Sequence, residues 1–257
     1  MRLRLCYVVG AMLLALGACG DDQTSRQDTG PIDAPLSIDG RLVLYTFNEG
    51  VGVTVGDVSG VAPAIDLSVF DPDSITWDSG SLRIDDATLI RSDIAAAKVS
   101  DAIFASEELT IEMWLTPLDA AQTGPARLLS LGRDASTHNV MLGQESDRFV
   151  ARLRTFETDA NGQQLETDGG QVVAGQLTHV VFTRSTTGMA RIFVNSAIRA
   201  ELNITGQLLS WDSTFQLSLA NEADQSEGPW RGTYHRVGVF DNAFSADMVF
   251  DRFQAGP

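Results

Sequence analysis

From Gly40 onward, apolar and polar residues alternate over short stretches that turn-forming residues interrupt at close intervals. In Leu109–Leu115 every second residue is Leu, Ile or Met, so one side of an extended strand is apolar. Pro117 then ends the strand. Further strands are expected at 41–47, 127–131, 139–142, 149–155, 179–183, 190–194, 197–204, 214–219 and 236–240. Many short strands with little helix indicate an all-β, two-sheet antiparallel β-sandwich.

One helix is expected near the end of the chain. Ser245 is a good N-cap and Asp247 falls in the first turn, where a carboxylate favours the helix dipole. Phe244 and Val249 are spaced for a hydrophobic staple. No shift of composition interrupts residues 40–257, so we predict a single domain with a short C-terminal helix.

The first residues have the pattern of a cleaved secretory leader. Arg2 and Arg4 precede an apolar run of about a dozen residues, which is shorter than the roughly 20 that a spanning helix needs. The run ends in Leu16-Gly17-Ala18-Cys19, which resembles a bacterial lipobox. We therefore expect a leader at 1–18, a lipid-modified Cys19, and a flexible acidic tether at 19–39.

Charge and cysteine usage limit the candidate partners. The formal net charge is -16, which argues against nucleic acid and against electrostatic docking on anionic lipids. The two cysteines, Cys6 and Cys19, fall in the leader and at the lipidation position, so no disulfide is expected in the domain. Gly20 follows Cys19 where an Asp would favour inner-membrane retention, so we expect anchoring at the outer membrane or cell surface.

Five motifs in order resemble laminin-G-like, concanavalin A-like lectin/glucanase jelly-roll domains. They lie at 42–60 (LVLYTFNEGVG, then DVSG), 109–117 (LTIEMWLTP), 175–183 (GQLTHVVFT), 190–195 (ARIFVN) and 230–245. The resemblance implies a jelly roll over nearly all of 40–257. Two departures stand out: His235 and Arg236 replace an acidic pair of the family, and Asn195-Ser196 replaces its Asn-Gly turn, which suggests a longer turn.

No catalytic constellation is evident, and we expect a non-catalytic protein. Related endoglucanases carry carboxylates at alternate strand positions, but Glu107 and Glu108 are adjacent and Glu112 is alone in its strand. A G-x-S-x-G nucleophile motif is absent. The histidines, His138, His179 and His235, are too widely spaced for a zinc motif, and we expect His179 to be a structural residue bonded to backbone.

Three sets of residues are candidate ligand sites. Trp77 and Trp211, each followed by an Asp, are candidates for stacking on a sugar, with burial in the core as the alternative. Arg152 and Arg154 share a strand face and are candidates for an acidic ligand, with pairing to nearby carboxylates as the alternative. The acidic opening of the family implies calcium as the candidate cofactor, at Glu49 and Asp57; solvated acidic loops are the alternative.

The functional expectation is therefore an envelope-anchored, non-catalytic binding module for carbohydrate or an envelope polymer. The first alternative is a protein-interaction or structural lipoprotein, and the second is a glycoside-acting enzyme. An exposed aromatic ring beside polar groups would favour glycan binding. A flat apolar patch would favour a protein partner. Two carboxylates about 5 to 9 Å apart in a cleft would favour hydrolysis.

Overall fold

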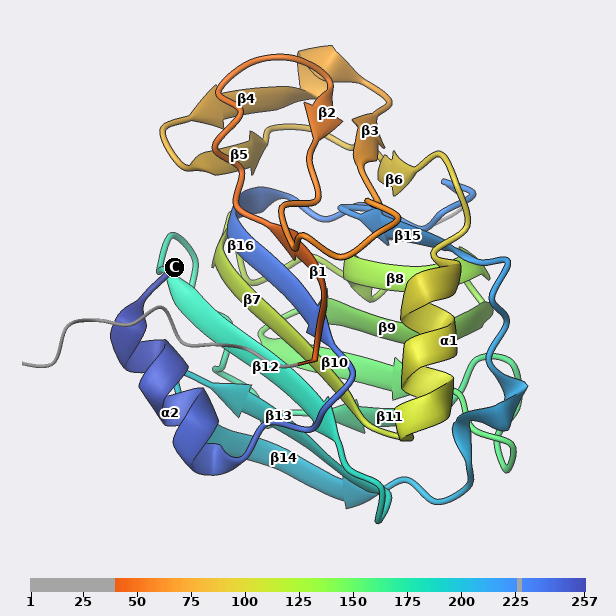
Figure 1. The fold of residues 1–257 in the computed structure, drawn as a ribbon. Helices are drawn as coiled ribbons and strands as arrows, with labels where there is room; N and C mark the ends of the chain where they lie inside the picture. Colours follow the sequence, from red (N-terminus) through yellow and green to blue (C-terminus); the bar gives the residue numbers. More distant parts are fainter. Residues whose placement is uncertain (1–39, 226–227) are drawn as a thin grey trace, which may run out of the picture. The chain divides into compact units, whose positions relative to one another are not determined.

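The computed structural model describes residues 40–225 and 228–257, and one compact unit contains all of them. The expected leader, Cys19 and tether lie outside the described residues. Two antiparallel sheets of eight strands each form the body of the unit (Figure 1), which confirms the predicted all-β sandwich. No helix among the described residues is long and apolar enough to cross a membrane.

Sheet A is the layer against which the helix α2 (Ala246–Ala255) packs. Its strands are β1 (Arg41–Tyr45), β4 (Ile75–Asp78), β5 (Ser81–Ile84), β7 (Leu109–Pro117), β12 (Thr178–Arg184), β13 (Met189–Val194), β14 (Ala197–Asn203) and β16 (Gly232–Phe240). They lie in the order β14-β13-β12-β7-β16-β5-β4, and β1 pairs with β16. Strands distant in sequence are thus neighbours in the middle of the sheet.

Sheet B is the second layer. Its strands are β2 (Thr54–Val55), β3 (Leu67–Val69), β6 (Ile90–Ser92), β8 (Ala126–Asp134), β9 (Thr137–Glu145), β10 (Arg148–Leu153), β11 (Gln163–Glu166) and β15 (Gln216–Leu219). Their order is β11-β10-β9-β8-β15-β6-β3-β2. The remaining elements are the helices α1 (Ala97–Ser106) and α2 (Ala246–Ala255) and the 3-10 turns η1 (Pro72–Ser74) and η2 (Leu208–Ser210).

The apolar positions predicted from the alternation form the layer between the sheets. Leu109, Ile111, Met113 and Leu115 of β7 belong to one core cluster with residues such as Leu129 of sheet B. The intervening residues of β7 are buried too, because other elements cover the outer face of sheet A. The central strands are therefore buried on both faces.

The predicted C-terminal helix is confirmed as α2. The Ser245 hydroxyl accepts a hydrogen bond from the backbone N–H of Met248, and Phe244 and Val249 belong to one buried cluster. The turn at Asn195-Ser196 has only two residues, so the prediction of a longer turn was wrong. Both residues adopt positive φ, which suits a tight hairpin.

The sequence pattern did not predict the helix α1. Its first turn follows Ala96, which provides no side-chain cap, and it ends at Glu107 in the left-handed conformation instead of at a glycine. Neither end therefore carries the usual boundary signal.

A buried ion pair fixes α2 on the outer face of sheet A. Glu112 of β7 accepts hydrogen bonds from the Arg252 guanidinium on both carboxylate oxygens and contacts Nε2 of His179 at 2.9 Å. Trp114, His179 and the ring of Phe253 stack beside it. His179 is thus structural as expected, but its ring bonds to a carboxylate and not to backbone.

Burial raises the pKa of Glu112, but the hydrogen bonds from His179 and Arg252 outweigh burial and lower the pKa to about 2. The carboxyl is therefore charged at neutral pH, where α2 provides its counter-charge.

We expect Glu112→Ala to lower the free energy of unfolding by about 3 to 5 kcal/mol, because it leaves the Arg252 charge buried and unpaired. Urea unfolding followed by circular dichroism measures the change. In contrast, Glu201→Ala should cost about 1 kcal/mol or less, because the Arg191–Glu201 pair on the same sheet is well exposed. Equal costs for the two variants would contradict the role given to Glu112.

The pH dependence provides a second readout of the same contact. A carboxyl whose pKa is lower in the folded than in the unfolded protein adds stability above its unfolded pKa. That stability is lost as the pH falls from about 4.5 through about 2. Glu112→Gln should flatten the acid limb of the stability curve, whereas an unchanged limb would contradict the assignment.

Candidate functional site

A pocket of about 600 Å³ opens among loops at the β12–β13 turn. It is lined by Ser106, Glu107, Phe156, Glu157, Arg184, Thr186, Thr187, Gly188, Thr205, Gly206 and Gln207. These residues come from the end of α1, the β10–β11 loop, the β12–β13 turn and the segment before η2. A volume of this size lies in the usual range for small-molecule sites.

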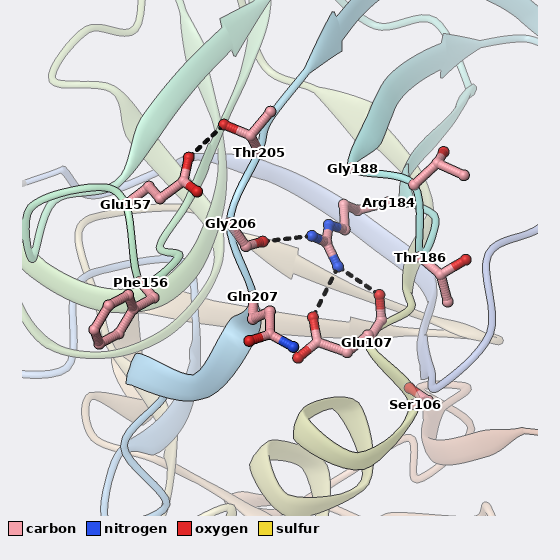
Figure 2. A pocket seen from close by; sticks show the side chains of 11 residues that line it. Ser106, Glu107, Phe156, Glu157, Arg184, Thr186, Gly188, Thr205, Gly206 and Gln207 are labelled. Carbon is pink, nitrogen blue, oxygen red and sulfur yellow. Dashed lines mark hydrogen bonds and ion pairs between the residues drawn. The ribbon is translucent and has the colours of Figure 1, made fainter.

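Arg184 holds these loops together. Its guanidinium donates to the backbone oxygens of Glu107 and Gly206, at 2.6 and 2.7 Å, and to the Glu107 carboxylate. The same carboxylate accepts the backbone N–H of Leu208 at the start of η2. Figure 2 shows Arg184 between Glu107 and Gly206. Glu107 and Arg184 thus form the frame of the pocket, and each neutralises the other.

Two glycines allow the backbone to approach closely at this site. Gly188 and Gly206 both have positive φ. A Cβ at Gly188 would lie 2.8 Å from the backbone oxygen of Ile204, and one at Gly206 would lie 2.7 Å from the hydroxyl of Thr155. Any side chain at either position would therefore push the loops apart and change the pocket.

The ligand-accessible chemistry comes from Phe156, Glu157 and a set of hydroxyls. Phe156 is 73% exposed, although its backbone is fixed by a hydrogen bond to Gln207. Glu157 accepts a hydrogen bond from the Thr205 hydroxyl at 2.6 Å through one carboxylate oxygen, Oε2. Phe156 and Glu157 lie on one side of Arg184 in Figure 2, and Thr186 lies on the other. An aromatic ring thus borders a polar recess.

The predicted stacking residues do not line this pocket. Trp211 is only 9% exposed and belongs to the core, where its indole N–H donates to the backbone oxygen of Arg154. Trp211 therefore presents no free ring face for a sugar, and of its two predicted roles the structure shows burial in the core. Trp77 is half-buried against the same core, and its indole N–H donates to the backbone oxygen of Gly52.

The two candidate arginines are also separate from the pocket. Arg152 donates to the side-chain oxygens of Asn161 and Gln164, so its partners are amides and not the expected carboxylates. Arg154 lies just beyond the end of β10 and does not extend a strand face with Arg152. The predicted strand was two residues too long at that end.

The predicted calcium residues are held by protein donors. Asp57 accepts hydrogen bonds from the backbone N–H groups of Leu44, Ser59 and Ile65 and pairs with the Lys98 ammonium at 2.8 Å. Burial raises the pKa of Asp57, but these hydrogen bonds outweigh burial and leave the pKa below its ordinary value. Glu49 accepts the N–H of Gly56. A calcium ion bound to Asp57 would have to displace Lys98.

Within residues 40–225 and 228–257, no three His, Cys, Asp or Glu side chains gather as they would around a metal ion. The pocket could not be predicted from the sequence, because its residues come from four distant segments. The usable local signal was Phe156, a bulky apolar residue in the otherwise polar stretch from Thr155 to Asp159.

The two packed antiparallel sheets are those of a concanavalin A-like jelly-roll sandwich. The family model of the concanavalin A-like lectin/glucanases superfamily, Laminin_G_3, matches residues 92–250, and the chain belongs to this family. No curated protein matches the sequence significantly.

Solved structures share the fold at low sequence identity. The binding domain of botulinum neurotoxin DC in complex with rat synaptotagmin II superposes with a TM-score of 0.59 at 12% identity, over 84% of this chain and 52% of that one. Trypanosoma rangeli sialidase in complex with 2,3-difluorosialic acid gives 0.60 at 13%, over 83% and 33%. This chain therefore spans about half of the toxin domain and a third of the sialidase.

A third structure, of botulinum neurotoxin type C, is described by entry into cells that depends on two ganglioside molecules. It gives a TM-score of 0.59 at 11% identity, over 84% of this chain and 51% of that chain. At these identities the likeness establishes the fold alone.

We expect Lys98→Gln to lower the free energy of unfolding by about 3 to 5 kcal/mol, because the Asp57 carboxylate would be buried without its counter-charge. Lys98→Arg keeps the charge and should cost less. Thermal unfolding with calcium or EDTA then tests the metal site: calcium held by Glu49 and Asp57 should stabilise Lys98→Gln more than the unchanged protein. A calcium response that survives Asp57→Asn would assign the ion to another place.

Proposed function

We propose that this protein is an envelope-anchored, non-catalytic binding module whose loop pocket accepts a sugar unit of a glycan or envelope polymer. The observation that carries the proposal is the exposed ring of Phe156 at the border of a polar recess. A sugar has one apolar C–H face and a rim of hydroxyls, so it needs both kinds of surface at once.

The polar groups of the pocket match a neutral sugar. Thr186, Thr187 and Thr205 carry hydroxyls that both donate and accept, and the Glu157 carboxylate accepts hydrogen bonds from sugar hydroxyls. Arg184 is already engaged by Glu107 and Gly206, so it adds no free positive charge. The pocket therefore favours neutral or cationic sugars over acidic ones.

The similar structures support glycans as a ligand class for this fold. Their descriptions mention gangliosides for one neurotoxin and a sialic acid derivative for the sialidase. The match of the family model to the lectin/glucanase superfamily points in the same direction. Each is an analogy of fold, and the residues of the pocket carry the specific proposal.

A binding role is favoured over hydrolysis by the contacts of Glu107. Glycoside hydrolysis requires two carboxyl groups that are free to exchange protons or attack the sugar. The two oxygens of Glu107 are occupied by the N–H of Leu208 and by Arg184, which leaves Glu157 as the one pocket carboxylate with an oxygen available.

A protein partner is the second candidate, supported by the outward face of α2. Phe250 and Met248 are 51% and 40% exposed there, although the helix is otherwise packed on sheet A. The neurotoxin domain cited above is described in complex with rat synaptotagmin II, so the fold also serves protein recognition.

We expect Phe156→Ala to abolish the thermal stabilisation produced by the cognate glycan, because the variant removes the stacking surface but leaves the loop hydrogen bonds in place. The measurement is the unfolding midpoint of the purified full chain against a panel of neutral, amino and acidic glycans. A ligand at 100 times its dissociation constant adds about 2.7 kcal/mol, which moves the midpoint by several degrees.

Phe250→Ala is the matched control, since it removes an exposed phenylalanine from α2 and should keep the glycan response. Glu157→Gln should weaken binding, and an assay for released sugar should show no turnover with any variant. A glycan response that depends on Phe250 and not on Phe156 would reject the pocket, and turnover lost in Glu157→Gln would establish an enzyme.

Anchoring is tested separately at Cys19. We expect Cys19→Ser to move the protein from the membrane fraction to the soluble fraction, because the serine hydroxyl does not take the acyl chains that hold the protein on the bilayer. Fractionation of cells followed by mass analysis of the mature N-terminus measures the change. An unchanged distribution would contradict lipid anchoring while leaving the pocket proposal intact.

A further inference from the structure

The charges that line the loop pocket do not balance. Its ionisable side chains are Glu107, Glu157 and Arg184. Arg184 donates to the Glu107 carboxylate at 3.2 Å, so this pair carries no net charge. Glu157 forms no ion pair with any residue in 40–225 or 228–257. The pocket therefore keeps one uncompensated negative charge, on Glu157.

The Glu157 side chain is exposed, but it is held in position. Its backbone N–H donates to the Thr155 hydroxyl at 3.2 Å, and its Oε2 accepts the Thr205 hydroxyl at 2.6 Å. Its Cβ and Cγ each lie 3.1 Å from the point that a Cβ on Gly206 would occupy, so the stem packs against the glycine backbone. Glu157 thus loses little conformational freedom when a ligand binds.

The polar groups around Glu157 offer more acceptors than donors. Among the described residues no group donates to Oε1 of Glu157. The Thr205 hydroxyl uses its hydrogen on Oε2, so its lone pairs remain available to accept. The Nη groups of Arg184 are directed to the backbone oxygens of Glu107 and Gly206. A ligand group that is positively charged and donates several hydrogen bonds would satisfy this set of acceptors.

The ring of Phe156 adds a second attraction for a cation. Phe156 precedes Glu157 in the chain, both side chains line the pocket, and the ring is 73% exposed. Figure 2 shows the two residues on the same side of Arg184. The face of an aromatic ring attracts a cation within about 6 Å of its centre and also packs on the C–H face of a sugar. An amino sugar brings both of these groups to one ring.

We propose that the sugar unit bound in the loop pocket is an amino sugar whose free ammonium pairs with Oε1 of Glu157. This inference rests on the proposed function and narrows it from sugars in general to one class. The ammonium donates three hydrogen bonds and cancels the charge of Glu157. N-acetylation removes the charge and leaves a single N–H, and a sugar that carries a carboxylate is repelled.

The experiment compares two matched pairs of sugars by NMR titration of the purified full chain at about pH 6, where an amine is charged. The pairs are glucosamine with N-acetylglucosamine and galactosamine with N-acetylgalactosamine, and the members of a pair differ only at the amine. In at least one pair we expect the dissociation constant of the free amine to be about five- to tenfold lower, because an exposed ion pair and a cation–π contact each contribute severalfold. The preference should shrink between about 10 mM and 1 M sodium chloride, because the Debye length falls from about 30 to about 3 Å.

Glu157→Gln should remove the preference, so that both members of a pair bind with the same affinity. Glu201→Gln is the matched control, since it removes an exposed carboxylate of the same type from β14, outside the pocket, and should keep the preference.

Equal affinity of the unchanged protein for the free and acetylated amines would overturn the amino-sugar assignment and leave a neutral sugar as the ligand. A preference that survives Glu157→Gln would overturn the assignment as well. A lack of binding by these sugars and by the wider glycan panel would instead overturn the proposed function itself.

Discussion

Glu112 holds a negative charge on the outer face of sheet A, and the Arg252 guanidinium of α2 neutralises it out of contact with water. The charge determines how the sheet is covered, because a buried carboxylate tolerates only a partner that supplies both charge and hydrogen bonds. Arg252 of α2 provides both, and Val249 of the same helix joins Val181, Phe193, Phe240 and Phe244 in a second small core. The described residues contain no cysteine, so such contacts, and not disulfides, hold the covering segments in place there.

Sheet B also has a buried ion pair on its own outer face. Glu222 follows β15 and accepts hydrogen bonds from Arg127 Nε at 2.7 Å and from the Ser130 hydroxyl at 2.8 Å. All three side chains are buried, so the segment after β15 covers the middle strands of the sheet. A ligand on this face would first have to break a buried ion pair. The loop pocket needs no such step, which supports the proposal of a ligand site at the loops.

The strands could be predicted from the sequence because alternate burial leaves a local signal. The Ser245 cap of α2 was local as well, and both predictions are confirmed. The helix α1 was missed because Ala96 and Glu107 occupy its ends without capping chemistry. The strands β2 to β6 have two to four residues each, which is too short for a period to be recognised.

The site was harder to predict for a different reason. Trp77 and Trp211 were selected by residue type, but exposure depends on what the rest of the chain brings over a ring. Trp211 is covered in a position where its indole N–H donates a hydrogen bond to the backbone oxygen of Arg154, 57 residues away. Phe156 remains exposed because its loop is fastened by its backbone to Gln207, which leaves the ring free. Such contacts join distant segments, and no spacing within one motif encodes them.

The ion pair that frames the loop pocket determines which charge is left over for a ligand there. Arg184 and Glu107 cancel, so Glu157 leaves the pocket negative and disfavours anions. On the outer face of sheet A, Arg252 and Glu112 cancel in the same way, but both partners are buried and hold α2 on the sheet. At physiological ionic strength the Debye length is about 8 Å, so solvent-exposed charges act mainly within their own site. The selectivity of the proposed sugar site therefore depends on Glu157 more than on the net charge of the domain, because the neighbouring ion pair neutralises itself.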